Sequence, residues 1–411
     1  AESVTFTPAA ADGGTLNLIS LSSLVTIVAT EALLYDGRTD NDTLTTVGTA
    51  AGDVFVHTPG ATNDAGTLQV NSLLALVYQN LGSGGALTAD GGGGSDTLVA
   101  YGTAVNDSFT VGAAGQVNLN SRVVLNVASV ETLTLEGLDG NDTFTLVPAI
   151  SASVYTTMNF NGGAQSSATG DRVFLVATAG DDNINVSGQT VSLGGRTVQS
   201  SGMESIGLNA LGGDDLLTYD GVSGVTENIT IASSGIAGGG QLSAPNVTLV
   251  DFSGVERIDV NGNAPTPTET DTLAFAGTND ADVFTINLAA DGTDADPILQ
   301  LETAGVLLLT LRNYINFATL QVQGRDGEDT FNVTVDETGP SRDLFVDGGI
   351  PQGKKKSTDN LNIFYVPPRP SIIHSAATQD PDAGLVDLDY DTARFVVQYD
   401  GIEQVVIRRL A

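Results

Sequence analysis

Cysteine and tryptophan are absent from the chain, and its 411 residues include only two histidines. Without cysteine, neither disulfide bonds nor thiolate metal sites contribute to the fold. The histidines, His57 and His374, lie far apart in the sequence and match no metal-binding spacing such as H-E-x-x-H. The chain also lacks an apolar run of 18 residues, so we expect no insertion into a membrane.

Basic residues are scarce: 15 lysines and arginines stand against 49 acidic residues, which gives a net charge of −34 at pH 7. This balance argues against nucleic-acid binding, because that affinity comes from basic side chains that neutralise phosphates. Hydrophobic residues still make up 41% of the chain, so the acidity does not indicate a disordered tail. The three lysines stand together at 354–356, either as a solvated loop or as a basic knob that docks on an acidic neighbour.

Convincing helical periodicity is absent, and short alternating segments take its place. The clearest is Glu131–Leu146, with the sequence ETLTLEGLDGNDTFTL. Leu133 and Leu135 alternate with polar residues, which predicts a strand with one buried face. Phe144 and Leu146 alternate in the same way after the turn. We call this unit of strand, glycine, acidic turn and second strand the cassette.

The cassette recurs along the whole chain. Copies with the same spacing begin at residues 31, 85, 204 and 318, and less regular copies begin at 158, 256 and 344. The chain ends within a last copy that begins at Glu403. A weaker motif, Gly-Thr followed by aspartate, stands between several copies, as in GTAVNDSFTV from Gly102. Most intervals are near 25 residues or twice that, which predicts a repeat of roughly 25 residues.

This repetition predicts an all-β fold, an elongated parallel β-helix (β-solenoid) with rungs of roughly 25 residues. Cassette rungs would alternate with Gly-Thr rungs, and glycines such as Gly91, Gly137 and Gly162 would lie in one line. Residues 1–411 would form a single repetitive solenoid with an irregular excursion at 350–382. The alternative is a series of tandem β-sandwich modules, because the same alternation suits them.

The acidic turns are the candidate metal sites. GGGGSDTLV at Gly91 fits the calcium-binding pattern G-G-x-G-x-D-x-U-x in full, and the turns at Gly137 and Gly324 fit all but its second glycine. These stretches resemble the RTX (repeats-in-toxin) family and related Asp/Gly-rich bacterial surface repeats. The resemblance covers only the turns, and it implies an exported, parallel β-roll-like protein with calcium between stacked turns. In that family the repeats follow every nine residues, whereas here one match occurs per roughly 50, so a site would form between turns of different rungs.

Two roles are open for the aspartates of these turns. Calcium prefers six to eight oxygen ligands, and aspartates stacked at the ~5 Å spacing of strands repel one another unless a cation neutralises them. Aspartate also shapes turns by bonding to the nearby backbone, and we expect a structural role for the cassette glutamates as well. The candidate calcium ligands are Asp40, Asp42, Asp96, Asp139, Asp142, Asp181, Asp182, Asp214, Asp215, Asp280, Asp282, Asp326 and Asp329.

The two ends of the chain match the two halves of one cassette. The last copy supplies a first strand, Glu403–Ile407, and Glu2–Ala9 (ESVTFTPA) match DTFTLVPA from Asp142. An open rung is an exposed sheet edge, and head-to-tail contacts that do not close form filaments. We therefore expect two copies to share a rung, with frayed ends or a place in a longer chain as the alternatives. The predicted subunit interface comprises Glu2, Val4, Phe6, Pro8, Glu403, Val405 and Ile407.

Catalysis has little support, since no G-x-S-x-G or P-loop motif is present and the aspartates repeat along the whole length. We expect a structural protein rather than an enzyme: a subunit of a filament, sheath or surface layer that assembles with itself. A glycan-binding adhesin or matrix protein is the alternative, and a polysaccharide lyase or hydrolase is a more distant one. The opening residues AESVTFTP suit a mature end left by signal cleavage, which favours an extracellular or cell-surface location.

Overall fold

The computed structural model describes residues 1–147, 154–167, 170–245, 247–262, 271–288, 297–317, 319–336, 342–349, 358–367, 370–377, 382–390 and 393–410. These residues form strands, turns and one short 3-10 helix, η1 (Ile19–Leu21), with no α-helix among them. The chain divides into two compact units: unit 1 comprises Ala1–Thr178 and Gln189–Gly207, and unit 2 comprises Ala179–Gly188 and Leu208–Ala411.

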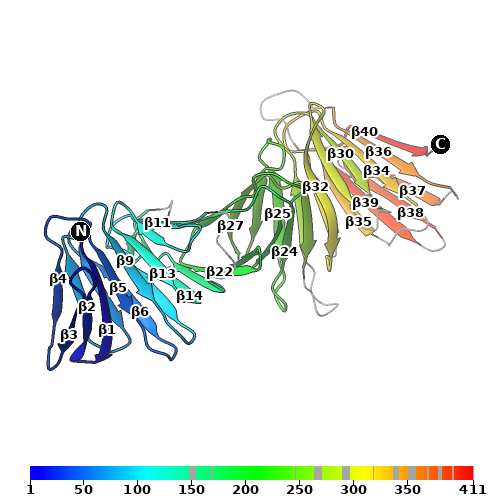
Figure 1. Cartoon of the computed structure of the whole chain (residues 1–411). Helices are drawn as coiled ribbons and strands as arrows, with labels where there is room; N and C mark the ends of the chain where they lie inside the picture. Colours follow the sequence, from blue (N-terminus) through cyan, green and yellow to red (C-terminus); the bar gives the residue numbers. More distant parts are fainter. Residues whose placement is uncertain are drawn as a thin grey trace. The chain divides into compact units, whose positions relative to one another are not determined.

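Each unit is a β-solenoid made of two sheets, which we call sheet A and sheet B (Figure 1). Within a sheet, copies of the repeat pair in parallel and in register. Leu133 of β14, for example, lies beside Leu98 of β10 on one side and Met158 of β17 on the other. The predicted all-β solenoid is therefore confirmed, and this parallel pairing of copies is not a feature of tandem sandwich modules.

The strands of unit 1 fall into the two sheets as follows. Sheet A contains β1 (Ser3–Ala10), β2 (Gly13–Leu18), β3 (Ser23–Ile27), β5 (Thr43–Val47), β9 (Ala86–Asp90), β11 (Ser108–Val111), β12 (Val117–Leu119), β13 (Val124–Ala128), β16 (Thr143–Leu146) and β19 (Arg172–Val176). Sheet B contains β4 (Leu33–Asp36), β6 (Val54–Pro59), β7 (Gly66–Val70), β8 (Leu76–Gln79), β10 (Thr97–Tyr101), β14 (Thr132–Glu136), β17 (Thr157–Asn161), β21 (Thr190–Leu193) and β22 (Arg196–Ser201). A separate two-stranded ribbon pairs β15 (Asp139–Gly140) with β18 (Ala164–Gln165).

Unit 2 has the same plan, and β23 (Ser205–Asn209) spans the boundary at Gly207. Its sheet A contains β25 (Asn228–Ser233), β26 (Gly240–Ala244), β27 (Val247–Ser253), β29 (Thr272–Ala276), β33 (Thr319–Gln323), β35 (Arg342–Asp347), β37 (Ser371–Ala376), β38 (Gly384–Asp389) and β39 (Arg394–Asp400). Its sheet B contains β20 (Asn183–Ser187), β24 (Leu216–Asp220), β28 (Arg257–Asn261), β30 (Asp282–Asn287), β31 (Leu299–Thr303), β32 (Val306–Ile315), β34 (Thr330–Val335), β36 (Asn360–Tyr365) and β40 (Gln404–Arg409).

The predicted spacing applies where the chain makes a plain turn, with one strand in each sheet. Thr132 of β14 pairs with Thr157 of β17, which is 25 residues further along the chain. The doubled intervals arise differently from the expected second kind of rung. A three-stranded antiparallel meander is inserted, as in β6–β7–β8, so that Val54 of β6 pairs with Thr97, 43 residues further on.

Apolar side chains of the two sheets fill the interior of each unit. Phe109 and Phe144 of sheet A stack with ring centroids 5.2 Å apart, and Phe144 lies 5.6 Å from Phe160 of sheet B. All three are 0–1% exposed. Because each fully buried side chain of this size contributes roughly 1.5–3 kcal/mol, every added turn stabilises its neighbours.

Equivalent glycines form two lines rather than the single line expected. Gly137 and Gly162 follow the paired strands β14 and β17 of sheet B, whereas Gly91 follows β9 of sheet A. The motif therefore marks a crossing between the sheets in either direction. A second difference concerns 350–382, where β36 and β37 are ordinary members of the two sheets, while 350–357, 368–369 and 378–381 lie outside the described residues.

Candidate functional site

A ladder of buried acids runs along the turns of each unit. At each step the backbone N–H of the acid that precedes a strand donates to the carboxylate of the equivalent acid in the next turn. Asp142 takes part in two steps: its carboxylate accepts the N–H of Asp107 at 2.7 Å, and its own N–H donates to Asp171 at 2.6 Å. Further steps join Asp53 to Asp96, Asp96 to Glu131, Asp171 to Glu204, Asp182 to Asp215, Asp215 to Glu256, Glu227 to Asp271, Asp282 to Asp329, Asp329 to Asp359 and Asp359 to Glu403.

The cassette glutamates close these ladders. At Glu131, Glu204, Glu256 and Glu403 the carboxylate accepts the backbone N–H of an aspartate in the neighbouring turn. Each of these glutamates directly precedes a strand that pairs with its donor's strand, as Thr132 after Glu131 pairs with Thr97 after Asp96. Their geometry is that of a structural hydrogen bond, as the sequence predicts.

The Gly-Thr motif marks the first acid of a ladder. Asp107 receives the backbone N–H of Thr103 at 2.5 Å, the Thr103 hydroxyl at 3.0 Å and the amide of Asn120 at 2.6 Å. Asp53 and Asp282 are held in the same way, by Thr49 and Asn71 and by Thr278 and Thr303. Sequence reasoning missed these roles, although threonine four residues before aspartate is the signal that identifies them.

The acids inside a ladder have an unusual environment. Asp142 is fully buried, and its Oδ2 lies against the Cα of Gly137 without a hydrogen-bond partner. Burial raises the pKa of Asp142 to about 6, against the N–H of Asp107, and the charges of Asp171 and Asp107 raise it further. Burial likewise raises the pKa of Asp329 to about 7. These acids can hold a proton near neutral pH, but they present no face to a substrate.

The structure divides each predicted calcium pair between the inside and the outside of its turn. The buried members belong to the ladders or to the same kind of bond: Asp42, Asp96, Asp142, Asp182, Asp215, Asp282 and Asp329. The outer members are Asp40, Asp139, Asp181, Asp214 and Asp280, which are exposed, and Asp326, which is half-buried. Within the described ranges, no three His, Asp or Glu side chains are grouped so as to hold a metal ion. Calcium binding stays a prediction.

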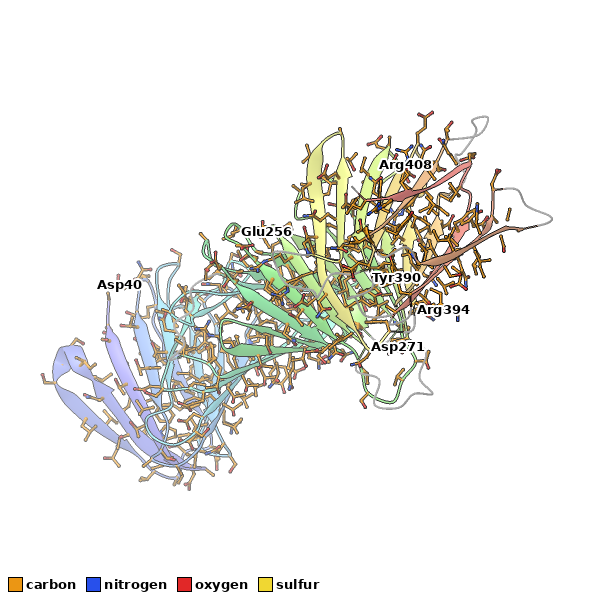
Figure 2. The ribbon with its side chains drawn as sticks, turned by 90° about the vertical axis from the view of Figure 1, so that its right-hand side faces the viewer. Asp40, Glu256, Asp271, Tyr390, Arg394 and Arg408 are labelled. Atoms are coloured by element: carbon orange, nitrogen blue, oxygen red, sulfur yellow. The ribbon has the colours of Figure 1, made fainter. Side chains whose placement is uncertain are left out.

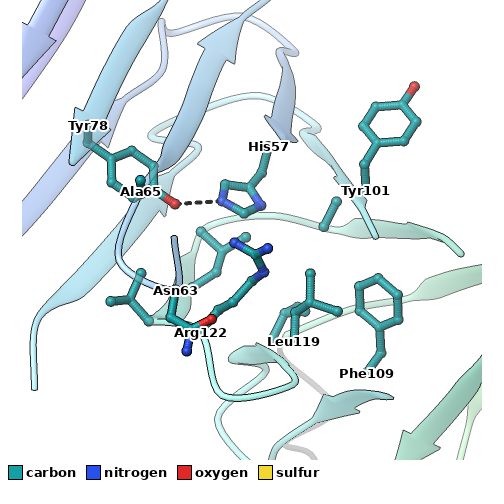
Figure 3. Close-up of a pocket in the computed structure, with 12 residues that line it drawn as sticks. His57, Asn63, Ala65, Tyr78, Tyr101, Phe109, Leu119 and Arg122 are labelled. Carbon is teal, nitrogen blue, oxygen red and sulfur yellow. Dashed lines mark hydrogen bonds between the residues drawn. The ribbon is translucent and has the colours of Figure 1, made fainter. Parts of the chain in front are cut away.

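A small cavity in unit 1 lies beside His57 of β6 (Figure 3). The Nε2 of His57 is 2.8 Å from the hydroxyl of Tyr78, and the Arg122 guanidinium donates to the carbonyl of Gly60 at 3.0 Å. Burial, with a smaller contribution from Arg122, lowers the pKa of His57 to about 4, so the ring is neutral at pH 7. The cavity volume is about 10 Å³, roughly the room that one water needs, which is too little for an organic substrate.

The residues predicted to form a subunit interface fall into two groups. Val4, Phe6 and Pro8 are buried in β1, which pairs with β2 on one side and β5 on the other. Glu2 precedes β1 and donates its N–H to Asp42. The C-terminal group lies at an edge: Val405 and Ile407 belong to β40, and Glu403 directly precedes it. The interface itself remains a prediction.

Four strands lie at open sheet edges. In the part of the chain that the structure describes, β3 pairs only with β2, β4 only with β8, β37 only with β38 and β40 only with β36. Apolar side chains are exposed on or next to each of them: Leu24 at 69% on β3, Leu34 at 56% on β4, Ile373 at 57% on β37 and Leu410 at 42% after β40. These strands combine unpaired backbone groups with exposed apolar surface, which is the usual composition of a protein interaction surface.

No protein-family model matches the chain, and no curated protein matches it in sequence. In the described part of the chain, no helix has the length and apolar character that crossing a membrane requires.

Proposed function

We propose that this protein is a structural subunit that assembles head to tail through its sheet edges into an extracellular filament, sheath or surface layer. One observation carries the proposal: β3, β4, β37 and β40 are each paired on one side only within the described residues. Native proteins normally cover such edges or place charges on them, because an open sheet edge can pair with a strand of another chain. Pairing with another copy would satisfy the unpaired backbone groups.

The acid ladders support this role. Their carboxylates are buried and already accept backbone N–H groups from the next turn, so they stabilise the stacking of turns instead of facing a ligand. A net charge of −34 also disfavours lateral aggregation of the bodies, which leaves the ends as the favoured contacts.

Negative-stain electron microscopy of the purified protein, over a range of concentrations, tests the proposal. We expect unbranched threads of constant width whose length increases with protein concentration. Particles that remain the length of one chain at every concentration, with the sedimentation coefficient of a monomer, would contradict it.

A further inference from the structure

The outer strands of sheet B differ in charge at the two ends of the chain. β4, at the N-terminal edge of unit 1, carries Asp36, whose carboxylate accepts bonds from Gln79 at 3.1 Å and Asn80 at 2.9 Å. β40, at the C-terminal edge of unit 2, carries Arg408, which is labelled in Figure 2, and Arg409, and both residues are exposed. Two adjacent arginines at one edge are unusual in this chain, which has only 15 basic residues and 49 acidic residues.

The free sides of these two strands have complementary backbone patterns. In a parallel sheet, alternate residues direct both their N–H and their C=O to the same neighbour. The N–H of Gly37 donates to Gln79 of β8 at 3.0 Å, so Leu34 and Asp36 direct their backbone groups to the free side of β4. These are the residues whose side chains face outward.

The opposite set of residues is available on β40. The N–H of Gln404 donates to Asp359 at 3.2 Å, so Val405 and Ile407 direct their backbone groups to the free side. Their side chains face inward, beside those of β36. The same arrangement exists between β4 and β8. There, residues of β4 with inward side chains direct their backbone groups to residues of β8 with outward side chains.

One register satisfies both patterns if β40 of one copy lies parallel to β4 of the next. Ile407 lies beside Tyr35 in that register, so its N–H reaches the carbonyl of Leu34 and its carbonyl accepts the N–H of Asp36. The inward side chains continue the column of the sheet. The same register sets Arg408 directly beside Asp36, which gives opposite charges on the outer face of the joint.

Glu31, a cassette glutamate without a hydrogen-bond donor in the described residues, fits the same register. Of the five cassette glutamates, four accept the N–H of the residue that precedes the neighbouring strand. The fifth, Glu31, lies before β4, is exposed, and has no hydrogen bond within the described residues. In the proposed register, the residue that precedes the neighbouring strand is Glu403 of the other copy. The Glu403 carboxylate closes the ladder of its own copy, and its backbone N–H would be the donor that Glu31 of the next copy lacks.

Sheet A must rearrange to allow this joint, as a comparison within unit 1 shows. There, β10 and β14 are parallel neighbours in sheet B, β9 precedes β10, and β16 follows β14. Three strands, β13, β12 and β11, lie between β9 and β16 in sheet A. A joint between β40 and β4 likewise leaves three positions between β39 and the next copy's β5. Five strands compete for them: β37 and β38 of one copy, and β1, β2 and β3 of the next.

The hairpin β2–β3 is the pair of strands that loses least by leaving. Its side chains are poorly buried, with Leu24 69% and Val25 44% exposed. In the competing hairpin β37–β38, by contrast, Val386 and Leu388 are fully buried. Once β2–β3 leaves, β37 can cover the exposed side of β1 as a parallel neighbour.

The covered form of this contact already exists in unit 1. The meander β37–β38–β39 repeats β6–β7–β8, because His374 bonds the hydroxyl of Tyr399 at 2.9 Å as His57 bonds that of Tyr78 at 2.8 Å. β6 has the parallel neighbour β10 and its His57 is 8% exposed, whereas His374 on the edge strand β37 is exposed. In the joint, β1 of the next copy would take the place of β10.

We propose that copies of this chain join by parallel pairing of β40 with β4 of the next copy, in the register that sets Arg408 beside Asp36, and that the hairpin β2–β3 is a detachable cap. The inference rests on the proposed head-to-tail assembly and specifies its joint. It also returns Val4 and Phe6 of β1 to the interface that the sequence predicts.

Charge exchange tests the register. Arg408→Asp and Asp36→Arg should each raise the protein concentration needed for threads at least tenfold, while Glu328→Arg, at an exposed turn far from either edge strand in the sequence, should not. An equimolar mixture of the first two variants should form threads again, because alternating copies restore opposite charges at every joint. If the wild-type protein forms no threads, the proposed function itself fails. If both single variants assemble like the wild type, the register is wrong and the function stands.

A reversible disulfide tests the cap, in a chain that has no cysteine of its own. Thr5 and Asn17 are opposite residues of β1 and β2, so Thr5→Cys with Asn17→Cys locks the hairpin when oxidised. Thr110→Cys with Asn118→Cys, across β11 and β12, is the matched control. We expect the first variant to form threads only after reduction and the control to form them in both states. Equal assembly of the locked and reduced forms would overturn the cap.

Discussion

The segments β1–β4 and β11–β14 follow one plan, but only the second is covered on its outer side. In each, a three-stranded meander in sheet A ends at a residue with positive φ, Ala29 at 50° and Ser129 at 52°. A cassette glutamate and a strand of sheet B follow. β13 pairs with β9, whereas β3 has no neighbour beyond β2 in the described residues.

The missing neighbour accounts for the differences between the two segments. Leu125 of β13 is 3% exposed, and Val25 at the same place in β3 is 44% exposed. Glu131 accepts the N–H of Asp96 at 2.7 Å, and Glu31 has no such donor among the residues that the structure describes. The exposure of Val25 and the missing donor of Glu31 therefore have one cause: the segment β1–β4 lacks the neighbouring copy of the repeat that covers β11–β14.

The largest effect should come from removing an inward side chain in each segment. Leu125→Ala leaves a cavity against β9 and should destabilise unit 1 by about 2–5 kcal/mol. Val25→Ala removes a half-exposed side chain and should cost less than about 1 kcal/mol in the unassembled protein. Urea unfolding followed by circular dichroism measures both. Equal losses would mean that β3 is covered in solution, which would contradict the open edge.

The glutamates give the second pair. Glu131→Ala leaves the buried N–H of Asp96 without an acceptor, so we expect a loss of about 1–3 kcal/mol. Glu31→Ala should change the stability of the unassembled chain by less than about 0.5 kcal/mol. Glu131→Gln, which keeps a carbonyl oxygen as acceptor, should recover most of the loss. A large cost at Glu31 would show that it already has a donor within its own copy.

The sequence was sufficient for the fold because its signals are local. Alternation at Leu133 and Leu135 predicts a half-buried strand, and the repeat of the cassette predicts that successive copies stack. The direction in which each turn crosses was not predictable, since Gly91 and Gly137 occupy the same motif but leave different sheets. The motif describes a crossing between sheets, and it is the same for either crossing.

The candidate sites were only partly predictable, for a similar reason. Acid pairs such as Asp181 and Asp182 are visible in the sequence, but the burial of one member depends on the neighbouring turn. The ladder steps join residues roughly 30 to 45 positions apart, as with Asp107 and Asp142, or Asp53 and Asp96. No local pattern specifies such a partner, because the inserted meanders change the distance along the chain.

The pH dependence should separate an inner acid from an acid at the edge. Asp142 has a pKa of about 6 in the folded protein, above the usual value near 4 in the unfolded chain, so its contribution to stability rises as the pH falls from 7. Between pH 7 and 5.5 this gain in the free energy of unfolding is about 0.8 kcal/mol, and Asp142→Asn should remove it. The side-chain bonds from Asn80 and Gln79 lower the pKa of Asp36, so this carboxylate is ionised throughout this range. Asp36→Asn should therefore leave the pH dependence of stability between pH 7 and 5.5 unchanged.

The comparison with the wild type is needed because His57 acts in the opposite direction. Its pKa of about 4 lies below the unfolded value, so the unfolded state binds a proton first and stability falls as the pH drops through 6.5. This loss is present in both proteins and cancels in their difference. A difference between Asp142→Asn and the wild type that stays constant from pH 7 to 5.5 would show that Asp142 is ionised throughout.

Calcium should have the smallest effect, since the outer acids are exposed and solvent screens their charges. If stacked turns hold the ion, excess calcium raises the melting temperature by about one or two degrees more than magnesium does. Asp181→Asn should remove that difference, because it takes one charge from the turn while keeping the acceptor for the N–H of Asp214, 2.9 Å away. Asp40→Asn, in the first acidic turn, should not remove it, since the Asp40 carboxylate already lies 3.2 Å from the N-terminal ammonium. The wild type and both variants could instead respond equally to calcium and magnesium. The rise in melting temperature would then come only from screening of the net charge of −34. In that case the buried ladders alone would account for the stacking of the acidic turns.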